Sequence, residues 1–337
     1  YSKRRYCFYH WRRRYLENRQ KTVKIINKIL ELLPEMPKDK EEITAKLKKA
    51  LGAKKVKENI PLAPLTTFGI GGPAFWFISA ENKKEILEAI KASRELEIPF
   101  FILGGGSNIL IADQGFPGLV IRIKNEGLTL KGTKVTAEAG LPLAKLIEVA
   151  QKNLLSGLEC GVGIPGSVGG AVCGNAGTRE EWIGKTIEEV SIIDKKGEII
   201  HLNNRDCKFS YRESRFKNNP QEVILEATFT LKKEKREVIE QKIKSFLKAR
   251  ENQPKEKSAG SVFKNPPDDS AGRLIDQAGL KGKKIGQAQI SEKHANFIIN
   301  TGGAKAEEVL KLIRLAQKTV KEKFNVNLEL EIKLVGF

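Results

Sequence analysis

The sequence predicts an α+β fold, in which strands and helices are mixed without a strict alternation. Apolar residues recur at the spacing of helices in some segments and at the two-residue period of strands in others, along most of the chain. After a charged helical segment and Pro254 this pattern starts again, which marks a boundary between two regions. The length of 337 residues is sufficient for two or three domains of about 150 residues each.

Residues 1–57 form an extension whose composition differs from that of the rest. Residues 1–35 contain ten Lys or Arg and three Glu, and four of the five tyrosines lie in the first fifteen positions. We favour the interpretation that Met36, the only methionine, is the start and that 1–35 has no catalytic role. The alternative is a nucleic-acid-binding arm, because arginines interleaved with aromatic residues can neutralise phosphates and stack on bases. Helical spacing occurs at 21–33 and 39–51.

Residues 58–233 are expected to form two lobes, about 58–125 and 126–233. Strands are predicted at 74–80, 99–108 (running into glycines), 118–123 and 222–231, hairpins at 128–140 and 190–202, and helices at 82–98 and 142–155.

Residues 234–337 are expected to form the second region. It opens with the charged helix at 234–251 and continues as a strand at 294–300, a helix at 305–324 and a strand at 327–336. One face of the helix predicted at 305–324 is apolar, through Val309, Ile313, Ala316 and Val320.

Composition excludes several classes of protein. No apolar run approaches the roughly 20 residues of a membrane span. The four cysteines and three histidines have no zinc spacing and no paired spacing, so we expect no metal and a reducing cytoplasm. The net charge is +19, of which +7 lies in 1–35 and 19 − 7 = +12 in the remainder. Such a charge favours solubility and attracts anionic ligands.

Two glycine-rich loops could bring backbone amides close to phosphates. The first is GGGSN (104–108), directly after a strand, and the second is GVGIPGSVGGAVCGNAG (161–177). Gly161, Gly163 and Gly166 match the dinucleotide fingerprint G-x-G-x-x-G, but a helix precedes them and Pro165 interrupts the turn, so we reject a Rossmann site. Two loops in one region still favour a dinucleotide such as FAD.

Ser261, in SAGSVFKNPPDD (258–269), lies in a segment that presents a serine without the setting of a nucleophile. No G-x-S-x-G elbow surrounds it, and none of the three histidines is near it in the sequence.

Seven motifs together resemble the UDP-N-acetylenolpyruvoylglucosamine reductase (MurB) family, in its shorter subtype. They occur in order from about residue 58 to 337: PLAPLTTFGIGGPA, GGGSNIL, GIPGSVGGAV with NAG, YRESRFK, SAGSVFKNP, AGRLIDQAGLKG and HANFIIN. The resemblance implies a two-part FAD-binding region of the vanillyl-alcohol-oxidase (PCMH) type at 58–233. A C-terminal α+β substrate-binding domain at 234–337 would follow it.

The resemblance also implies a reaction in peptidoglycan precursor synthesis. NADPH would reduce non-covalently bound FAD, and UDP-N-acetylglucosamine enolpyruvate would then take hydride at its vinyl carbon and a proton at the adjacent carbon. Ser261 aligns with the proton donor of the family and needs no histidine, because the acceptor is strongly basic. Arg212 aligns with the arginine that binds the substrate carboxylate, and its planar fork suits that role. Glu331 aligns with a glutamate that assists protonation. Strand periodicity alone cannot distinguish it from Glu329.

Ligand contacts carry over from the same motifs. The flavin-binding residues implied are Gly104, Gly105, Gly106, Ser107, Asn108, Gly163, Pro165, Gly166, Ser167 and Gly170. The substrate-binding residues implied are Tyr211, Lys264, Asn265 and Gln277. Asn265 could instead hold its own loop, and Gln277 could be an ordinary residue on a helix surface.

Two other functions remain open from the residues. A different FAD oxidoreductase of the same fold would commonly tether its flavin through histidine or cysteine, for which only Cys160, Cys173 and His201 are available. A nucleic-acid-binding protein is the alternative suggested by the charge, although we expect neither a nucleic-acid nor a membrane partner.

Overall fold

The computed structural model describes residues 40–337. The basic segment, Met36 and the helix predicted at 21–33 lie outside the described residues. The chain divides into two compact units, the second of which comprises Leu47–Phe337. Helix α2 (Lys40–Leu51) confirms the helix predicted at 39–51.

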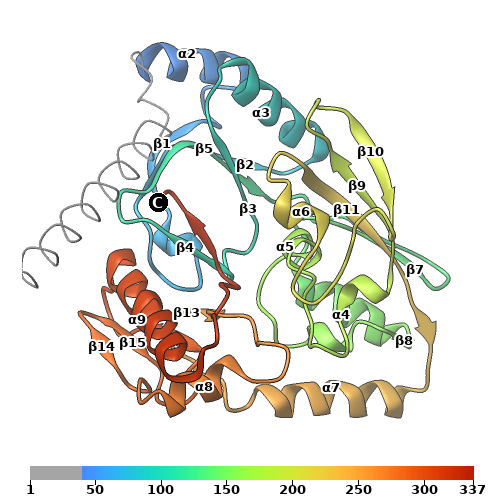
Figure 1. Cartoon of the computed structure of the whole chain (residues 1–337). Helices are drawn as coiled ribbons and strands as arrows, with labels where there is room; N and C mark the ends of the chain where they lie inside the picture. The colour runs from blue at the N-terminus through green and yellow to red at the C-terminus, as the bar shows by residue number, and fades with distance from the viewer. Residues whose placement is uncertain (1–39) are drawn as a thin grey trace, which may run out of the picture. The chain divides into compact units, whose positions relative to one another are not determined.

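A four-stranded sheet forms the first part of the second unit (Figure 1). Its strand order is β1 (Lys57–Pro61), β2 (Pro73–Ala80), β5 (Phe116–Ile123) and β3 (Phe100–Leu103). Strand β1 is antiparallel to β2, and β5 is parallel to both of its neighbours. Helix α3 (Lys83–Glu95) packs on β2 and β5 through a buried face that includes Ile86 and Ile90. Asn82 caps this helix by accepting a hydrogen bond from the Glu85 amide at 3.0 Å.

An antiparallel five-stranded sheet forms the second part. Its order is β10 (Ile199–Asn203), β9 (Ile187–Ile193), β11 (Val223–Thr230), β7 (Lys134–Glu138) and β6 (Leu128–Lys131). Both predicted hairpins are present, and Gly132 takes a φ of +63° in the first turn, a conformation that favours glycine. Helix α5 (Val168–Cys173) packs against β7 and β11, and α4 (Leu143–Lys152) packs against α5.

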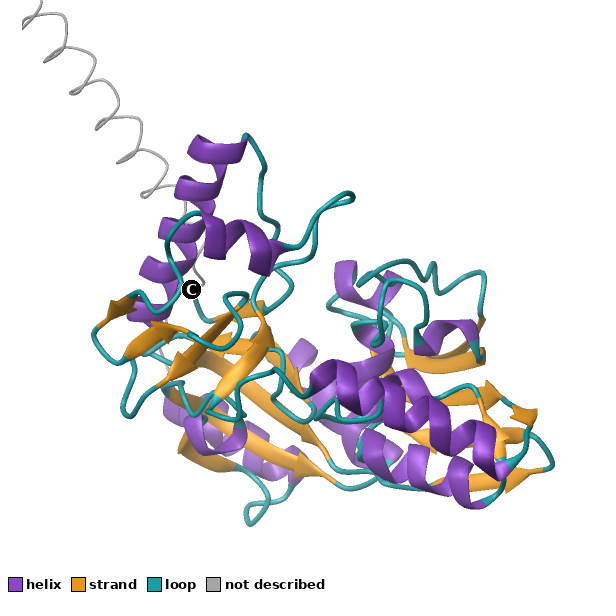
Figure 2. Cartoon of the chain, turned by 90° about the horizontal axis from the view of Figure 1, so that it is seen from below, coloured by secondary structure: helices purple, strands orange, loops and turns teal. Residues whose placement is uncertain are grey.

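The C-terminal residues build a third sheet with helices around it. Helix α7 (Arg236–Arg250) leads into the strand order β13 (Ser258–Ser261), β16 (Phe297–Asn300), β15 (Ala288–Ile290) and β14 (Lys284–Ile285). Helix α9 (Ala306–Phe324) packs on β14 and β15 and also contacts α8 (Ala271–Gln277). The four residues predicted for its apolar face are all buried. Figure 2 shows helices flanking strands throughout, and the α+β prediction is confirmed.

The strand predicted at 327–336 is wrong in extent. Only β17 (Lys333–Val335) is a strand, and it pairs in parallel with β4 (Ile109–Ile111), a strand that the sequence did not reveal. Residues 327–332 instead run beside the segment after β13, with one bridge between Leu330 and Phe263. The pairing forms a separate two-stranded sheet and brings the C-terminal segment back beside the chain between β3 and β5. Further short elements are β8 (Leu155–Ser156), β12 (Lys232–Lys233) and α6 (Arg215–Asn218).

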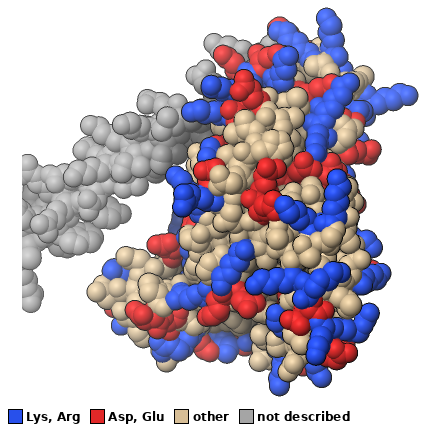
Figure 3. All heavy atoms as spheres, turned by 90° about the vertical axis from the view of Figure 1, so that its right-hand side faces the viewer, with Lys and Arg blue, Asp and Glu red and all other residues tan. Residues whose placement is uncertain are grey.

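On the face seen in Figure 3, basic and acidic side chains are interspersed. Within residues 40–337 no helix is long and apolar enough to cross a membrane. The same part of the chain contains no cluster of three or more His, Cys, Asp or Glu side chains that could hold a metal ion.

Candidate active site

The two glycine-rich loops predicted to bind a dinucleotide lie against one another. The Ser107 hydroxyl donates a hydrogen bond of 2.8 Å to the carbonyl of Pro165. A Cβ atom on Gly105 would lie 2.5 Å from the Cα of Gly166, and one on Gly104 would lie 2.6 Å from the Ser167 hydroxyl oxygen. Real Cβ atoms do not approach other atoms so closely, so only glycine allows the loops to meet here.

Backbone amides in these loops are available to a ligand. Among residues 40–337, the amides of 105–108 and of 163, 166 and 167 donate no hydrogen bond to another protein group. Adjacent amides without protein acceptors form a concave donor site that suits the oxygens of a diphosphate. The residues present therefore fit FAD. Ser167 has a structural task as well, because its hydroxyl accepts from the Gly170 amide at 3.4 Å and caps α5.

Arg212 lies at the tip of a tight turn. Ser210 and Glu213 exchange two backbone hydrogen bonds of 3.1 Å, which close the turn and leave Tyr211 and Arg212 between them. Arg212 has a φ of +56°, a left-handed conformation that costs a non-glycine residue about 1–2 kcal/mol. Such strain is concentrated at functional sites because the surrounding contacts must hold it.

Glu331 joins three parts of the chain. Its carboxylate Oε1 lies 2.8 Å from Nε of Arg212. The Arg212 Nε–H makes no aligned hydrogen bond within the described residues, so the two groups are close without a well-aligned hydrogen bond. The Glu331 amide donates to the carbonyl of Val262 at 2.8 Å, and its carbonyl accepts from the Asn108 side chain at 3.2 Å. The side chain of Glu331 is 13% exposed and that of Glu329 is 73% exposed, which separates two residues that the sequence pattern could not.

Burial raises the pKa of Glu331 above its ordinary value, even though the positive charges of Arg212, Lys217 and Lys264 favour the carboxylate. Removal from water disfavours the charged form, and here this effect exceeds the attraction of the cations. Glu331 can therefore retain a proton at a pH where an exposed glutamate has lost its own.

Ser261 directly precedes Val262, whose carbonyl accepts the hydrogen bond from the Glu331 amide. It ends β13, and the next residue, Val262, both donates to the carbonyl of Asn296 at 2.8 Å and accepts from the Glu331 amide. The Ser261 hydroxyl makes no hydrogen bond with another group in the described part of the chain, so it remains available to a ligand. The buried Asn296 fixes this segment through two further hydrogen bonds to the backbone of Phe263, at 3.0 and 2.8 Å.

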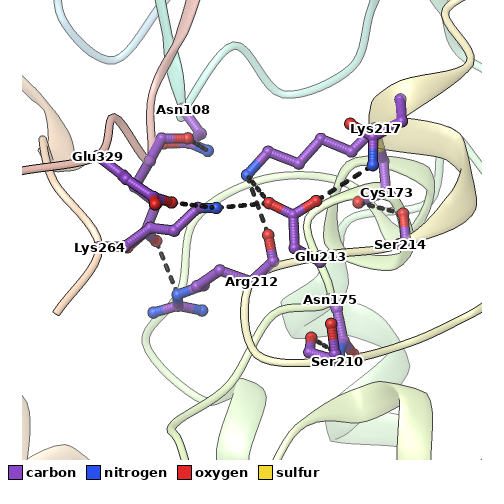
Figure 4. A network of polar contacts seen from close by, with 12 residues as sticks. Asn108, Cys173, Asn175, Ser210, Arg212, Glu213, Ser214, Lys217, Lys264 and Glu329 are labelled. Carbon is purple, nitrogen blue, oxygen red and sulfur yellow. Dashed lines mark hydrogen bonds and ion pairs between the residues drawn. The ribbon is translucent and has the colours of Figure 1, made fainter. Parts of the chain in front are cut away.

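Lys264 belongs to a network of charges around Arg212 (Figure 4). Its ammonium group donates to Glu213 at 2.6 Å and to Glu329 at 3.3 Å. The ammonium of Lys217 lies 3.5 Å from Glu213 and donates to the carbonyl of Arg212 at 2.9 Å. Sequence reasoning assigned no role to Glu213 or Lys217, although both lie in the YRESRFK motif.

The other predicted substrate contacts lie in different surroundings. The side-chain oxygen of Asn265 accepts from the Ala271 amide at the start of α8, so it holds its own loop. Gln277 is exposed on α8 and accepts from Arg273 at 2.7 Å, without a contact to Arg212 or Glu331.

Tyr211 is half-buried beneath Arg179, whose guanidinium lies 4.9 Å from the ring centre. Arg179 also donates to the carbonyls of Asn265, Pro266 and Pro267, so it ties the turn of Arg212 to the loop after Lys264. No motif in the sequence pointed to Arg179.

The candidate tethers for a covalent flavin are poorly suited to that task. Burial raises the pKa of the Cys160 thiol to about 11, and that of Cys173 is also raised by burial. A protonated thiol is a weak nucleophile. His201 is exposed on β10, where it pairs with Glu189 at 2.8 Å.

Comparisons with known proteins agree with this arrangement. Residues 253–335 match the family model described as UDP-N-acetylenolpyruvoylglucosamine reductase, C-terminal domain, and residues 76–203 match that of an FAD binding domain. The chain is 42% identical over 298 residues to the UDP-N-acetylenolpyruvoylglucosamine reductase of Clostridium novyi, covering 88% of this chain and 97% of that protein. It is 45% identical over 281 residues to the protein of that name from Caldicellulosiruptor bescii, covering 82% and 89%.

A crystal structure of UDP-N-acetylenolpyruvylglucosamine reductase (MurB) from Thermus caldophilus superposes on the structure of this chain with a TM-score of 0.73 at 40% identity. The match covers 82% of this chain and 98% of that one. From the ordered motifs, the two matching family models and these relatives, it follows that the chain belongs to the UDP-N-acetylenolpyruvoylglucosamine reductase (MurB) family.

Proposed function

We propose that this chain reduces UDP-N-acetylglucosamine enolpyruvate to UDP-N-acetylmuramate with NADPH and FAD, in the synthesis of peptidoglycan precursors. The observation that carries the proposal is the contact between Arg212 and Glu331, beside the segment of Ser261 and next to the glycine-rich loops. The contact supports the proposal because it joins a cation suited to binding a carboxylate with a carboxyl group beside the segment that carries Ser261.

The free backbone amides of 105–108 and of 163, 166 and 167 would hold the FAD diphosphate. The FAD, when bound, supplies the hydride that reduces the carbon–carbon double bond. Everything else in the reaction falls to side chains that bind and orient the substrate or move a proton.

Arg212 binds the carboxylate of the enolpyruvyl group and stabilises the negative charge that develops there. Two donors of its guanidinium plane can meet two carboxylate oxygens at once. Lys264 provides a cation for the substrate diphosphate, and Tyr211 provides a flat surface next to Arg212.

Ser261 donates the proton to the carbon that carries the carboxylate. Its hydroxyl has no competing hydrogen bond in the described residues, and the acceptor carbon is basic enough to take its proton. Glu331, whose pKa is raised by burial, holds a proton close to the same centre.

We further infer that residues 58–233 act as the FAD-binding region and 234–337 as the substrate domain. Both contribute to the site, the first through Arg212 and the second through Ser261 and Glu331. We place the reaction in the cytoplasm, because the thiols of Cys160, Cys173 and Cys207 are unpaired and the substrates are nucleotides.

An anaerobic titration in two steps tests the proposal. NADPH should bleach the yellow flavin absorbance, and UDP-N-acetylglucosamine enolpyruvate should restore it. Ser261→Ala should bleach normally and recover at least about 10²-fold more slowly, since a positioned proton donor contributes about 10²–10⁴-fold. Ser245→Ala, at an exposed position on α7, serves as the matched control.

Two results would contradict the proposal. A colourless protein that takes up no FAD would exclude a flavoenzyme. Bleaching without recovery by this substrate would assign the reductase to a different substrate.

A further inference from the structure

Glu213 occupies the centre of the network in Figure 4. Its Oε1 atom accepts from Lys264 at 2.6 Å and lies 3.5 Å from the ammonium of Lys217, while Oε2 accepts from Asn218 at 3.4 Å. A single carboxylate thus faces two ammonium groups, one from α6, which directly follows the turn of Arg212, and one from the segment after Ser261.

The ammonium of Lys217 also holds the backbone of Arg212. It donates at 2.9 Å to the carbonyl of Arg212, the residue whose φ is +56°. A residue in this conformation keeps it only where neighbouring contacts favour it over the ordinary regions. Lys217 supplies one such contact, and Glu213 supplies the negative charge that keeps Lys217 in place.

The network favours the charged forms of Glu213 and Lys264. Partial burial opposes ionisation of Glu213, but the hydrogen bond from Lys264 and the charge of Lys217 outweigh it and lower the pKa of Glu213. Partial burial also opposes the charge of Lys264, and the hydrogen bond to Glu213 outweighs it and raises the pKa of Lys264. Both shifts favour the ionic form of the Glu213–Lys264 pair.

Glu213 lies at the surface, so its charge can be removed by substitution without creating a cavity in the hydrophobic core. Its side chain is 29% exposed and borders an open polar hollow of about 640 Å³. The residues around that hollow are Lys208, Ser210, Glu213, Ser214, Arg215, Asn218 and Asn219.

We propose that Glu213 and Lys217 are positioning residues, which act as a unit to hold the guanidinium of Arg212 in the orientation that binds the substrate carboxylate. This role rests on the proposed function, since it acts through Arg212 on the reaction described above. Glu213 connects the same unit to Lys264, so the Arg212 turn and the segment after Ser261 are held in one arrangement.

The test is a double-mutant cycle with Glu213→Gln and Lys217→Met in the full-length holoenzyme. The readout is kcat per bound FAD at saturating substrate. Each single variant should lower kcat about tenfold, and the double variant should be no slower than the slower single variant, because either change already breaks the unit. Lys217→Arg keeps the charge and the donors and should retain more activity than Lys217→Met.

A second ion pair provides the matched control. Lys83 lies 2.7 Å from Glu226, whose side chain is 21% exposed, and neither residue belongs to the site. Glu226→Gln and Lys83→Met should leave kcat within twofold of the wild type. Melting temperature and FAD content should change no more in the Glu213 and Lys217 variants than in these controls.

Three outcomes would overturn the role of Glu213. The first is a kcat within twofold of the wild type in Glu213→Gln. The second is a fall in melting temperature and FAD content with unchanged kcat per flavin, which would mean a purely structural pair. The third is a wild-type protein that does not turn over this substrate, which would refute the proposed function and this role with it, whereas the first two refute the role alone.

Discussion

Replacing Gly105 by alanine would make a methyl group clash with the backbone of the neighbouring loop at Gly166. The new Cβ would lie 2.5 Å from the Cα of Gly166 and 3.0 Å from its carbonyl carbon. Carbon atoms in contact prefer about 3.5–4.0 Å, so the loops would have to separate by about 1 Å. The amides that are free to bind the FAD diphosphate lie in these two loops, and separation moves them apart.

The expected loss is in FAD affinity. Forcing an extra methyl group into a packed site costs about 1–3 kcal/mol. Since each 1.4 kcal/mol is a factor of ten in an equilibrium constant, a cost of about 2 kcal/mol corresponds to a roughly thirtyfold weaker FAD complex.

The assay is a titration of the apoprotein with FAD, followed by the quenching of flavin fluorescence. Gly174→Ala is the matched control, because the nearest atom to its new Cβ is the Gly170 carbonyl oxygen at 3.5 Å, an ordinary contact. A Gly105→Ala protein that binds FAD within threefold of the wild type would refute the reasoning that these loops jointly hold the diphosphate.

Three further predictions concern titrating and charged groups. Arg212→Lys should retain FAD but lower kcat about 10²-fold, because an ammonium cannot bind a carboxylate through two coplanar donors; a loss below fivefold in stopped-flow turnover would contradict this. Burial raises the pKa of Glu331, so the carboxyl stays protonated to higher pH than usual, and turnover should fall as the pH rises through that value. Glu331→Gln should remove this limb from a kcat profile between pH 5 and 9, and an unchanged limb would assign it to another group. Burial lowers the pKa of His294 from 6.5, so the unfolded chain takes the proton more readily, and the melting temperature should fall between pH 7 and 5. His294→Gln should flatten that decline, and an equally steep one would exclude His294 as its source.

Long elements with clear periodicity could be predicted from the sequence. The helix expected at 305–324 is Ala306–Phe324, because a continuous apolar face determines both its type and its length. Strand β4 is not predicted by any local pattern, and β17 falls within a longer strand predicted at 327–336. Each has three residues and is defined only by its pairing with the other, which no local pattern reveals.

The candidate site was likewise predictable from the sequence only in part. Motifs pointed to Arg212, Ser261 and Glu331, whose segments the fold brings into contact. Strand periodicity left Glu329 and Glu331 equivalent, and only the family resemblance selected Glu331. The structure adds a physical difference, because the side chain of Glu331 is buried and that of Glu329 is exposed.

The local backbone conformation and the charge contacts of the site could not be predicted from the sequence. Neither the left-handed backbone of Arg212 nor the place of Glu213 between two lysines follows from residue types and spacing. The first depends on how one short turn is closed, and the second depends on Lys264, which is 51 positions from Glu213 in the sequence.

The pairing of β4 with β17 has a consequence for folding during synthesis on the ribosome. The paired residues Ile109 and Lys333 are 333 − 109 = 224 positions apart. At about 5–20 residues per second, roughly 10 to 45 s pass between the synthesis of the two strands. During that interval β4 has an open edge directly after the loop 104–108, and Glu331 has not yet been made. The candidate active site is therefore complete only after translation has passed β17, and flavin that binds earlier meets a site that still lacks Glu331.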